Sequence, residues 1–228
     1  MRWFRRKPQE DLPDPRTPWP HREIPDDPAA AAHRFWERWF ELLPETNAAL
    51  GDREPQRVEN ELAAAIAALH PDLHFSLERG RRAIYALVVT GQEDPALRPY
   101  TDAWKAAAPP EDAIWEFHDA VPPVPDPSEV TVNLGARRIA LADVRVAAQV
   151  EGGMVDVAVH HPDLAELDER SREAMTFLPL DATLGERLAG QRLRRVETAE
   201  AEPAESMSLL ELRDLVRGLD QGNVGGID

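Results

Sequence analysis

The chain has 228 residues, and its 42 acidic and 26 basic residues leave a formal net charge of −16. A body this acidic repels the phosphate backbone of nucleic acids, so we expect no nucleic-acid partner. Cysteine is absent, which excludes disulfides, a thiol nucleophile and thiolate metal ligands. No apolar run is long enough to span a membrane, and no signal peptide is recognisable, so we expect a soluble cytoplasmic protein. Arginine outnumbers lysine 24 to 2, which we attribute to codon usage in a GC-rich bacterium.

Residues 1–27 are predicted to form a disordered, proline-rich arm, because seven prolines fall within residues 8–28. The basic start, Met1–Lys7, has the composition of a membrane-surface or nucleic-acid tag. Seven residues are too few for stable membrane anchoring, so we interpret this start as disordered. One domain is predicted over residues 28–219, followed by a disordered tail over residues 220–228.

Two helices are predicted at the start of this domain. Asp27 and Pro28 form an N-cap with proline at the first helical position, and we expect this helix to end at Pro44. One face carries aromatic and apolar residues that we interpret as core, with a ligand groove as the alternative: Phe35, Trp36, Trp39, Phe40 and Leu43. The second helix is predicted over residues 53–69, with Val58, Leu62, Ile66 and Leu69 inward.

The middle of the chain contains strands and one further helix. The helix is predicted to begin at Asp94-Pro95 and to end at Pro109. The strands are predicted over residues 72–77, 83–90, 113–121 and 130–134. Residues 83–90 are a continuous apolar run, which is typical of a central strand buried on both faces.

The clearest β-hairpin of the chain follows these strands. Residues 144–150 and 155–159 alternate in polarity, and Gly152-Gly153 supplies the turn between them. A helix is then predicted from Pro162 to about Leu178. The elements do not follow a strict βαβ alternation, so the sequence predicts an α+β fold with a mostly antiparallel sheet and flanking helices.

The C-terminal part is predicted to hold a short strand, an acidic loop and a last helix. The strand covers residues 191–196, and the loop covers residues 197–205. Ser208 and Glu211 have the spacing of a capping box that opens the helix, with three leucines available for packing: Leu212, Leu215 and Leu219.

Three short motifs carry a resemblance to known proteins: His70-Pro71-Asp72-Leu73 before a strand, Ala107-Ala108-Pro109 before Trp115-Glu116-Phe117, and the late segment Leu180–Glu186, which reads Leu-Asp-Ala-Thr-Leu-Gly-Glu. The chain resembles a family of uncharacterised bacterial proteins that carry a domain of unknown function. The resemblance covers about residues 32–218 and implies the fold class. Some multidomain relatives are linked to regulators of ribonuclease activity, but the resemblance supplies no catalytic residue for this chain.

Histidines and carboxylates are the candidates for chemistry, and we single out six residues: His70, His74, His118, His161, Asp181 and Glu186. His70 and His74 have i, i+4 spacing, but Pro71 intervenes and the segment enters a strand, so this spacing does not place them on one helical face. His161 is expected to cap the helix that begins at Pro162. We therefore expect no metal site.

Asp181 and Glu186 could be paired acids in a cleft, although structural capping around Gly185 is the favoured interpretation. The chain has no phosphate-binding glycine motif and no nucleophile elbow, and we expect no cofactor. The preferred hypothesis is a non-catalytic binding or regulatory protein with a basic protein partner. The alternative is an enzyme or small-molecule binder that uses histidine and carboxylates in a cleft. The oligomeric state stays open.

Overall fold

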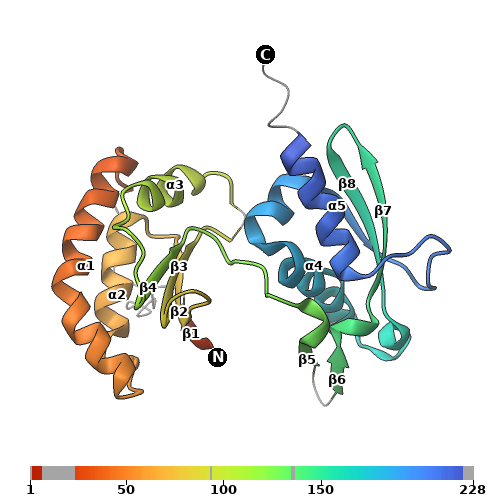
Figure 1. The fold of residues 1–228 in the computed structure, drawn as a ribbon, viewed down its shortest axis with the longest axis horizontal. Helices are drawn as coiled ribbons and strands as arrows, with labels where there is room; N and C mark the ends of the chain where they lie inside the picture. Colours follow the sequence, from red (N-terminus) through yellow and green to blue (C-terminus); the bar gives the residue numbers. More distant parts are fainter. Residues whose placement is uncertain (1, 7–23, 93, 135–136, 223–228) are drawn as a thin grey trace, which may run out of the picture. The chain divides into compact units, whose positions relative to one another are not determined.

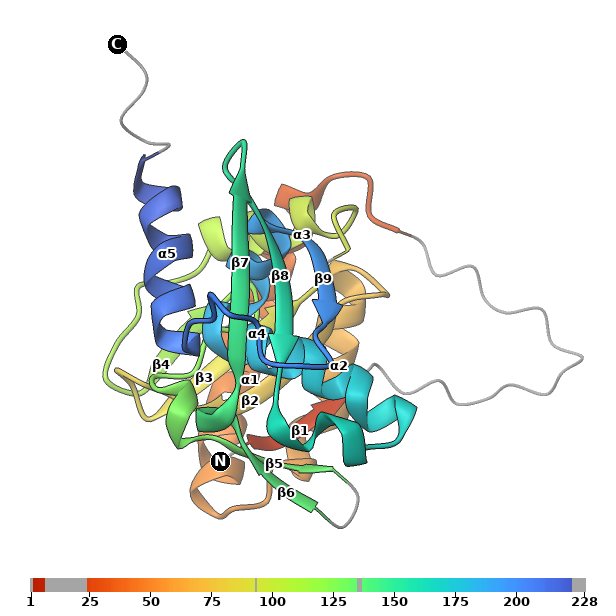
Figure 2. The same ribbon diagram turned by 90° about the vertical axis from the view of Figure 1, so that its right-hand side faces the viewer.

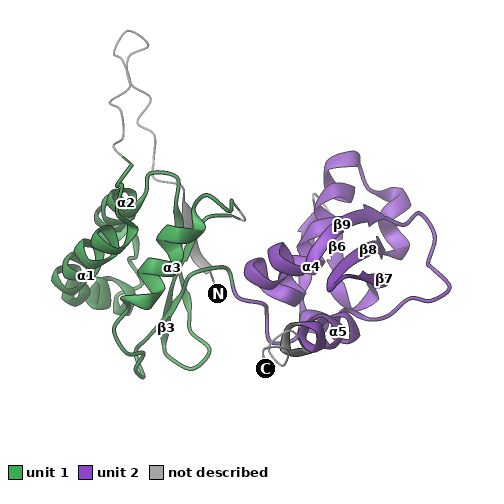
Figure 3. Ribbon diagram, turned by 90° about the horizontal axis from the view of Figure 1, so that it is seen from above, with its two compact units in different colours: residues 1–121 green, residues 122–228 purple. Residues whose placement is uncertain are grey.

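The computed structural model describes residues 2–6, 24–92, 94–134 and 137–222. The chain forms two compact units, residues 1–121 and residues 122–228 (Figure 3). One domain is predicted from the sequence over residues 28–219, whereas each unit has a hydrophobic core of its own. Polarity patterns reveal which side of a strand is buried, but they do not reveal which strands share a sheet, so the division is not visible in the sequence.

Unit 1 contains two long helices, α1 (Pro28–Gly51) and α2 (Gln56–Leu69), which follow one another in the chain (Figure 1). The Asp27 side chain caps α1 as predicted, because it accepts hydrogen bonds from the amides of Ala29 and Ala30. The predicted end at Pro44 is wrong, since the helix continues to Gly51. Proline removes one helical donor but leaves the buried face intact, and Thr46, Ala49 and Leu50 extend that face into the last turns.

A second prediction for α1 is wrong, because the sequence pattern places the Phe40 ring in the core. The side chain is 56% exposed, while Phe35, Trp36 and Trp39 are buried. Leu42 takes the inward position instead. The helical period of 3.6 residues carries Phe40 just past the edge of the buried stripe.

The sheet of unit 1 has the strand order β1-β2-β3-β4. Its strands are β1 (Arg2–Arg6), β2 (His74–Arg79), β3 (Tyr85–Thr90) and β4 (Trp115–His118). β3 pairs antiparallel with β2 and parallel with β4, so it is central, as its apolar run predicts. The parallel connection runs through α3 (Arg98–Ala106). The segment Arg2–Arg6 pairs with β2, although the sequence analysis assigns it to a disordered arm; residues 7–23 of that arm lie outside the described residues.

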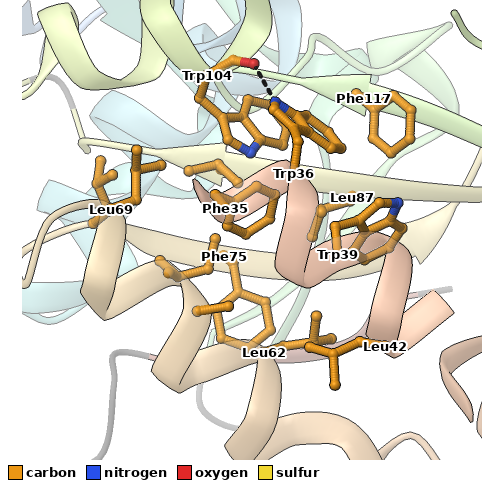
Figure 4. Packing of buried hydrophobic residues seen from close by; sticks show 14 of the residues in the cluster. Phe35, Trp36, Trp39, Leu42, Leu62, Leu69, Phe75, Leu87, Trp104 and Phe117 are labelled. Atoms are coloured by element: carbon orange, nitrogen blue, oxygen red, sulfur yellow. Dashed lines mark hydrogen bonds between the residues drawn. The ribbon is translucent and has the colours of Figure 1, made fainter. Parts of the chain in front are cut away.

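Aromatic rings from α1, α3 and the sheet fill the core of unit 1 (Figure 4). The Trp36 indole donates a hydrogen bond to the Trp104 carbonyl oxygen at 2.8 Å, and the two rings stack with centroids 5.0 Å apart. The rings of Phe117 and Trp36 meet edge to face, with centroids 4.9 Å apart. These contacts pack α1 and α3 against β4 of the sheet.

Unit 2 contains a two-stranded and a three-stranded sheet (Figure 2). β5 (Thr131–Leu134) pairs with β6 (Arg137–Ala140), and the three-stranded sheet has the order β7 (Arg145–Glu151), β8 (Met154–His160) and β9 (Leu193–Thr198). The predicted hairpin is present, because β7 and β8 are antiparallel and Gly152 and Gly153 turn with φ of 58° and 80°. Positive φ at both positions suits glycine.

The helices of unit 2 are α4 (Glu169–Arg192) and α5 (Leu209–Gly222), with short 3₁₀ helices at Pro127–Glu129, Leu141–Asp143 and Pro162–Glu166. The predicted helix end at Leu178 is wrong, since α4 continues through a kink at Gly185. The predicted capping box is present at the start of α5: the amide of Ser208 donates to the Glu211 carboxylate at 2.7 Å, and the amide of Glu211 donates to the Ser208 hydroxyl at 3.3 Å.

Both units share a ββαβ arrangement, in which the middle strand pairs antiparallel with the first strand and parallel with the third. Across the described residues, four of the six strand pairings are antiparallel. The predicted α+β class with mostly antiparallel strands is therefore confirmed. Within the same residues, no helix has both the length and the apolar character needed to cross a membrane.

Candidate functional site

His70 ends α2 and has a structural role. Its Nδ1 accepts a hydrogen bond from the Asp72 amide at 3.2 Å, and its ring lies 4.6 Å from that of Tyr100. Burial lowers the pKa of His70, against the opposing effect of the Asp72 and Asp94 carboxylates. The ring therefore serves as a neutral acceptor at the turn into β2.

His161 caps the 3₁₀ helix at Pro162–Glu166, as predicted. Its Nδ1 accepts a hydrogen bond from the Asp163 amide at 3.0 Å. An accepting Nδ1 places the proton of the neutral ring on Nε2. The preceding His160 lies in β8 and directs its Nδ1 to the Ala199 carbonyl at 3.1 Å. The two histidines thus bind different backbone groups and do not converge on one point.

His74 and His118, by contrast, lie on the same face of the four-stranded sheet. His74, Ser76 and Glu78 alternate along β2, and Glu116 and His118 alternate along β4, on the side opposite the aromatic core. Thr90 on β3 completes what we call the polar sheet face: His74, Ser76, Glu78, Thr90, Glu116 and His118. Three of these residues, Ser76, Glu78 and Glu116, are not among the site residues predicted from the sequence, although a polar residue at every second position of an apolar strand is a signal that identifies them.

Glu116 anchors the polar sheet face. Its side chain is only 1% exposed, and its carboxylate accepts hydrogen bonds from the backbone amides of Arg81, Arg82 and Ala83 at 2.8, 2.9 and 3.3 Å. Burial alone would raise the pKa of Glu116, but these amides and the His118 ring lower it to about 2. The carboxylate is therefore ionised at neutral pH and holds the β2–β3 loop, so it is unsuited to act as a general acid.

Serine, histidine and glutamate share this face without forming a catalytic triad. Ser76 and His118 both pair with Val88 from opposite sides, so they are two strand spacings apart, about 9–10 Å. Ser76 instead donates a hydrogen bond to Glu78 at 2.7 Å, and His118 Nε2 lies 3.1 Å from Glu116. A general base must reach its nucleophile within about 3 Å, so His118 cannot activate Ser76 in this arrangement.

Asp181 and Glu186 lie in α4 on either side of Gly185, and both are half-buried. Gly185 lies between two helical segments and has φ 75° and ψ 160°, a conformation that is essentially confined to glycine and differs from the left-handed helical cap. Within the described ranges, no three side chains of histidine, cysteine, aspartate or glutamate are grouped so that they could hold a metal ion.

The chain matches no protein-family model, no curated protein and no solved structure. Its function must therefore be inferred from its own geometry and charge.

Charge gathers on the helical layer of unit 1. Arg38 binds Glu41 and Glu61, each at 2.7 Å, and Arg57 binds Glu45, Asp52 at 2.8 Å and Glu54 at 3.5 Å. We call these seven residues the carboxylate network. Two arginines neutralise only two of its five carboxylates, so the network keeps a formal charge of −3.

Proposed function

We propose that this protein is a non-catalytic, cytoplasmic binding protein whose partner is a basic protein. Acidity is a property of the whole chain and is not confined to one segment. Residues 1–121 contain 22 acidic and 15 basic residues, and residues 122–228 contain 20 acidic and 11 basic residues. Both units therefore attract positive charge, and such a field accelerates association with a basic partner.

The observation that carries this proposal is the incomplete neutralisation of the carboxylate network. Its side chains are more than a third exposed, so an incoming cation meets them without a large desolvation cost. Exposed ion pairs of this kind contribute little to stability, at most about 1 kcal/mol each. A surplus of three carboxylates around two arginines is consequently better explained by attraction of a cationic surface than by stabilisation of the fold.

The engagement of the histidines supports a role without catalysis. His70, His160 and His161 each bind a backbone group, and His118 binds the buried Glu116. In each of these four rings one nitrogen is therefore committed to a structural contact.

Affinity capture tests the proposal. Immobilised full-length protein is incubated with a set of purified basic and acidic proteins at about 50 mM and about 300 mM salt. The basic proteins should be retained at low salt, and the triple variant Glu41→Gln/Glu45→Gln/Glu61→Gln should retain fewer of them.

The matched control removes three exposed carboxylates of unit 2, as Glu129→Gln/Glu173→Gln/Glu200→Gln. It changes the net charge equally and leaves the carboxylate network intact. Retention that is insensitive to salt, or equal loss in the two triple variants, would contradict the network as the site of attraction.

A second candidate function is an enzyme or small-molecule binder, and the Glu116–His118 pair favours it. A carboxylate that accepts from Nε2 leaves Nδ1 of the neutral ring as a base or acceptor. Imidazole NMR signals, recorded during a screen of small molecules, test this alternative. Ligand-dependent shifts at His118, with none at the exposed His33, would favour it over the binding protein.

A further inference from the structure

An exposed apolar stripe runs along the solvent side of α1. Phe40 is 56% exposed, although the other large aromatic residues of this helix are buried. Pro44 and Ala48 follow at four-residue intervals and are exposed as well. Residues at i, i+4 and i+8 lie above one another, so the three form a continuous stripe about 12 Å long.

Pro44 adds a polar feature to this stripe. Proline has no backbone N–H, so the Phe40 carbonyl lacks the helical donor that position 44 normally supplies. The helix nevertheless continues to Gly51. A backbone acceptor without its usual partner thus lies beside the exposed Phe40 ring.

Three glutamates run parallel to the apolar stripe. Glu37, Glu41 and Glu45 also repeat at four-residue intervals, and all three are exposed. Glu41 and Glu45 belong to the carboxylate network, whose two arginines leave a charge of −3. The apolar stripe is therefore bordered by a row of partly neutralised carboxylates.

We propose that this surface, which consists of Phe40, Pro44 and Ala48 with Glu37, Glu41 and Glu45, is the docking site for a basic amphipathic helix. The inference rests on the proposed function and specifies where and how the basic partner binds. The site repeats every 6 Å along a helix axis, which matches side chains at i and i+4 of a second helix. An apolar residue of that helix packs on Phe40, and its lysines or arginines meet the glutamates and the Phe40 carbonyl.

The test uses two synthetic helical peptides of about five turns, measured by fluorescence anisotropy with the full-length protein. The first peptide combines a leucine stripe with lysines on the other face. In the second, alanine replaces every leucine, so that charge and helicity are kept but the apolar stripe is lost. The leucine peptide should bind at least about tenfold more tightly than the alanine peptide.

Substitutions then locate the site. Phe40→Ser should weaken binding of the leucine peptide at least about tenfold, and Phe40→Leu should largely restore it. Phe177→Ser is the matched control, because Phe177 is a 46% exposed phenylalanine of unit 2, and it should have no effect. Glu37→Gln/Glu41→Gln should weaken binding and reduce its dependence on salt. Tryptophan fluorescence during urea unfolding verifies that unit 1 of each variant is folded.

The following results would overturn the docking site. Equal effects of Phe40→Ser and Phe177→Ser on the affinity for the leucine peptide would show that Phe40 is not part of the site. Equal affinity for the leucine and alanine peptides would show that the apolar stripe does not contribute to binding. Dimers that dissociate in the Phe40→Ser variant would identify a second copy of the chain as the occupant. If both peptides bind in a salt-dependent way without any effect at Phe40, the proposed function stands and the site is wrong; if neither peptide binds, the proposed function also falls.

Discussion

Replacing Glu116 by glutamine should destabilise unit 1 in a manner that depends on pH. The carboxylate accepts three backbone amides of the β2–β3 loop and is almost fully buried. Glutamine keeps one acceptor oxygen but turns an NH₂ group toward donors, so at least one of the three amides loses its partner. The loop that joins two neighbouring strands should then loosen.

The magnitude follows from the pKa of Glu116, which folding lowers from its ordinary value of 4.5 to about 2. This difference corresponds to about 3 kcal/mol in favour of the folded state when the carboxylate is ionised in both states. A carboxylate with a lowered pKa stabilises the folded state at pH values above about 4.5, and this stabilisation is lost as the pH falls from about 4.5 toward about 2. At about pH 3, less than half of it should remain.

Urea unfolding followed by tryptophan fluorescence measures this effect in unit 1. All six tryptophans lie within residues 1–121, so the signal does not report on unit 2. Glu116→Gln should lower the free energy of unfolding by about 2–4 kcal/mol at about pH 7, and the difference from wild type should shrink markedly at about pH 3. Glu37→Gln, an exposed carboxylate in α1, is the control and should differ little from wild type at either pH. A difference of the same size at both pH values would refute the electrostatic argument and indicate a packing defect.

Three further predictions concern unit 2, where amide hydrogen exchange is the measurement. Arg213 is buried and donates hydrogen bonds to the carbonyls of Thr183, Pro125 and Val124, each at 2.7 Å. Arg213→Met should therefore lower the free energy of unfolding by about 2–4 kcal/mol and accelerate amide exchange at Val124. Unchanged exchange at Val124 would contradict this role of Arg213. Ser208→Ala should cost about 1 kcal/mol and increase fraying of the first turn of α5, whereas uniformly fast exchange in the wild-type helix would show that the cap is irrelevant. Leu212→Ala should lower the free energy of unfolding by about 2–5 kcal/mol because this side chain is fully buried, and Leu215→Ala should lower it less because Leu215 is half-buried. The reverse order would contradict the packing of α5.

Only part of the candidate site could be read from the sequence. His74 and His118 are visible as candidates, but they are 44 positions apart, and only the pairing of β2, β3 and β4 brings them to one face. Glu116 escapes notice because its partners are backbone amides 33 to 35 positions earlier in the chain. Every residue except proline has a backbone N–H, so no sequence motif identifies a carboxylate that binds backbone amides.

Features with both partners within a few residues were determined by the sequence itself. The Asp27 cap, the His161 cap, the glycine turn between β7 and β8 and the capping box of α5 are all present as predicted. Their hydrogen bonds or dihedral angles depend on neighbours in the chain, and the identities of those neighbours are sufficient to specify them.

Tertiary packing alone decided how far α1 extends and which of its faces stays exposed. Pro44 removes one helical hydrogen bond, but the buried Thr46, Ala49 and Leu50 keep the helix folded beyond it. The same packing leaves Phe40 outside the core, although the aromatic pattern of the sequence predicts that Phe40 lies inside it. The division into two units likewise follows from which side chains meet across long distances in the chain, because burial in a core depends on partners that local periodicity cannot identify.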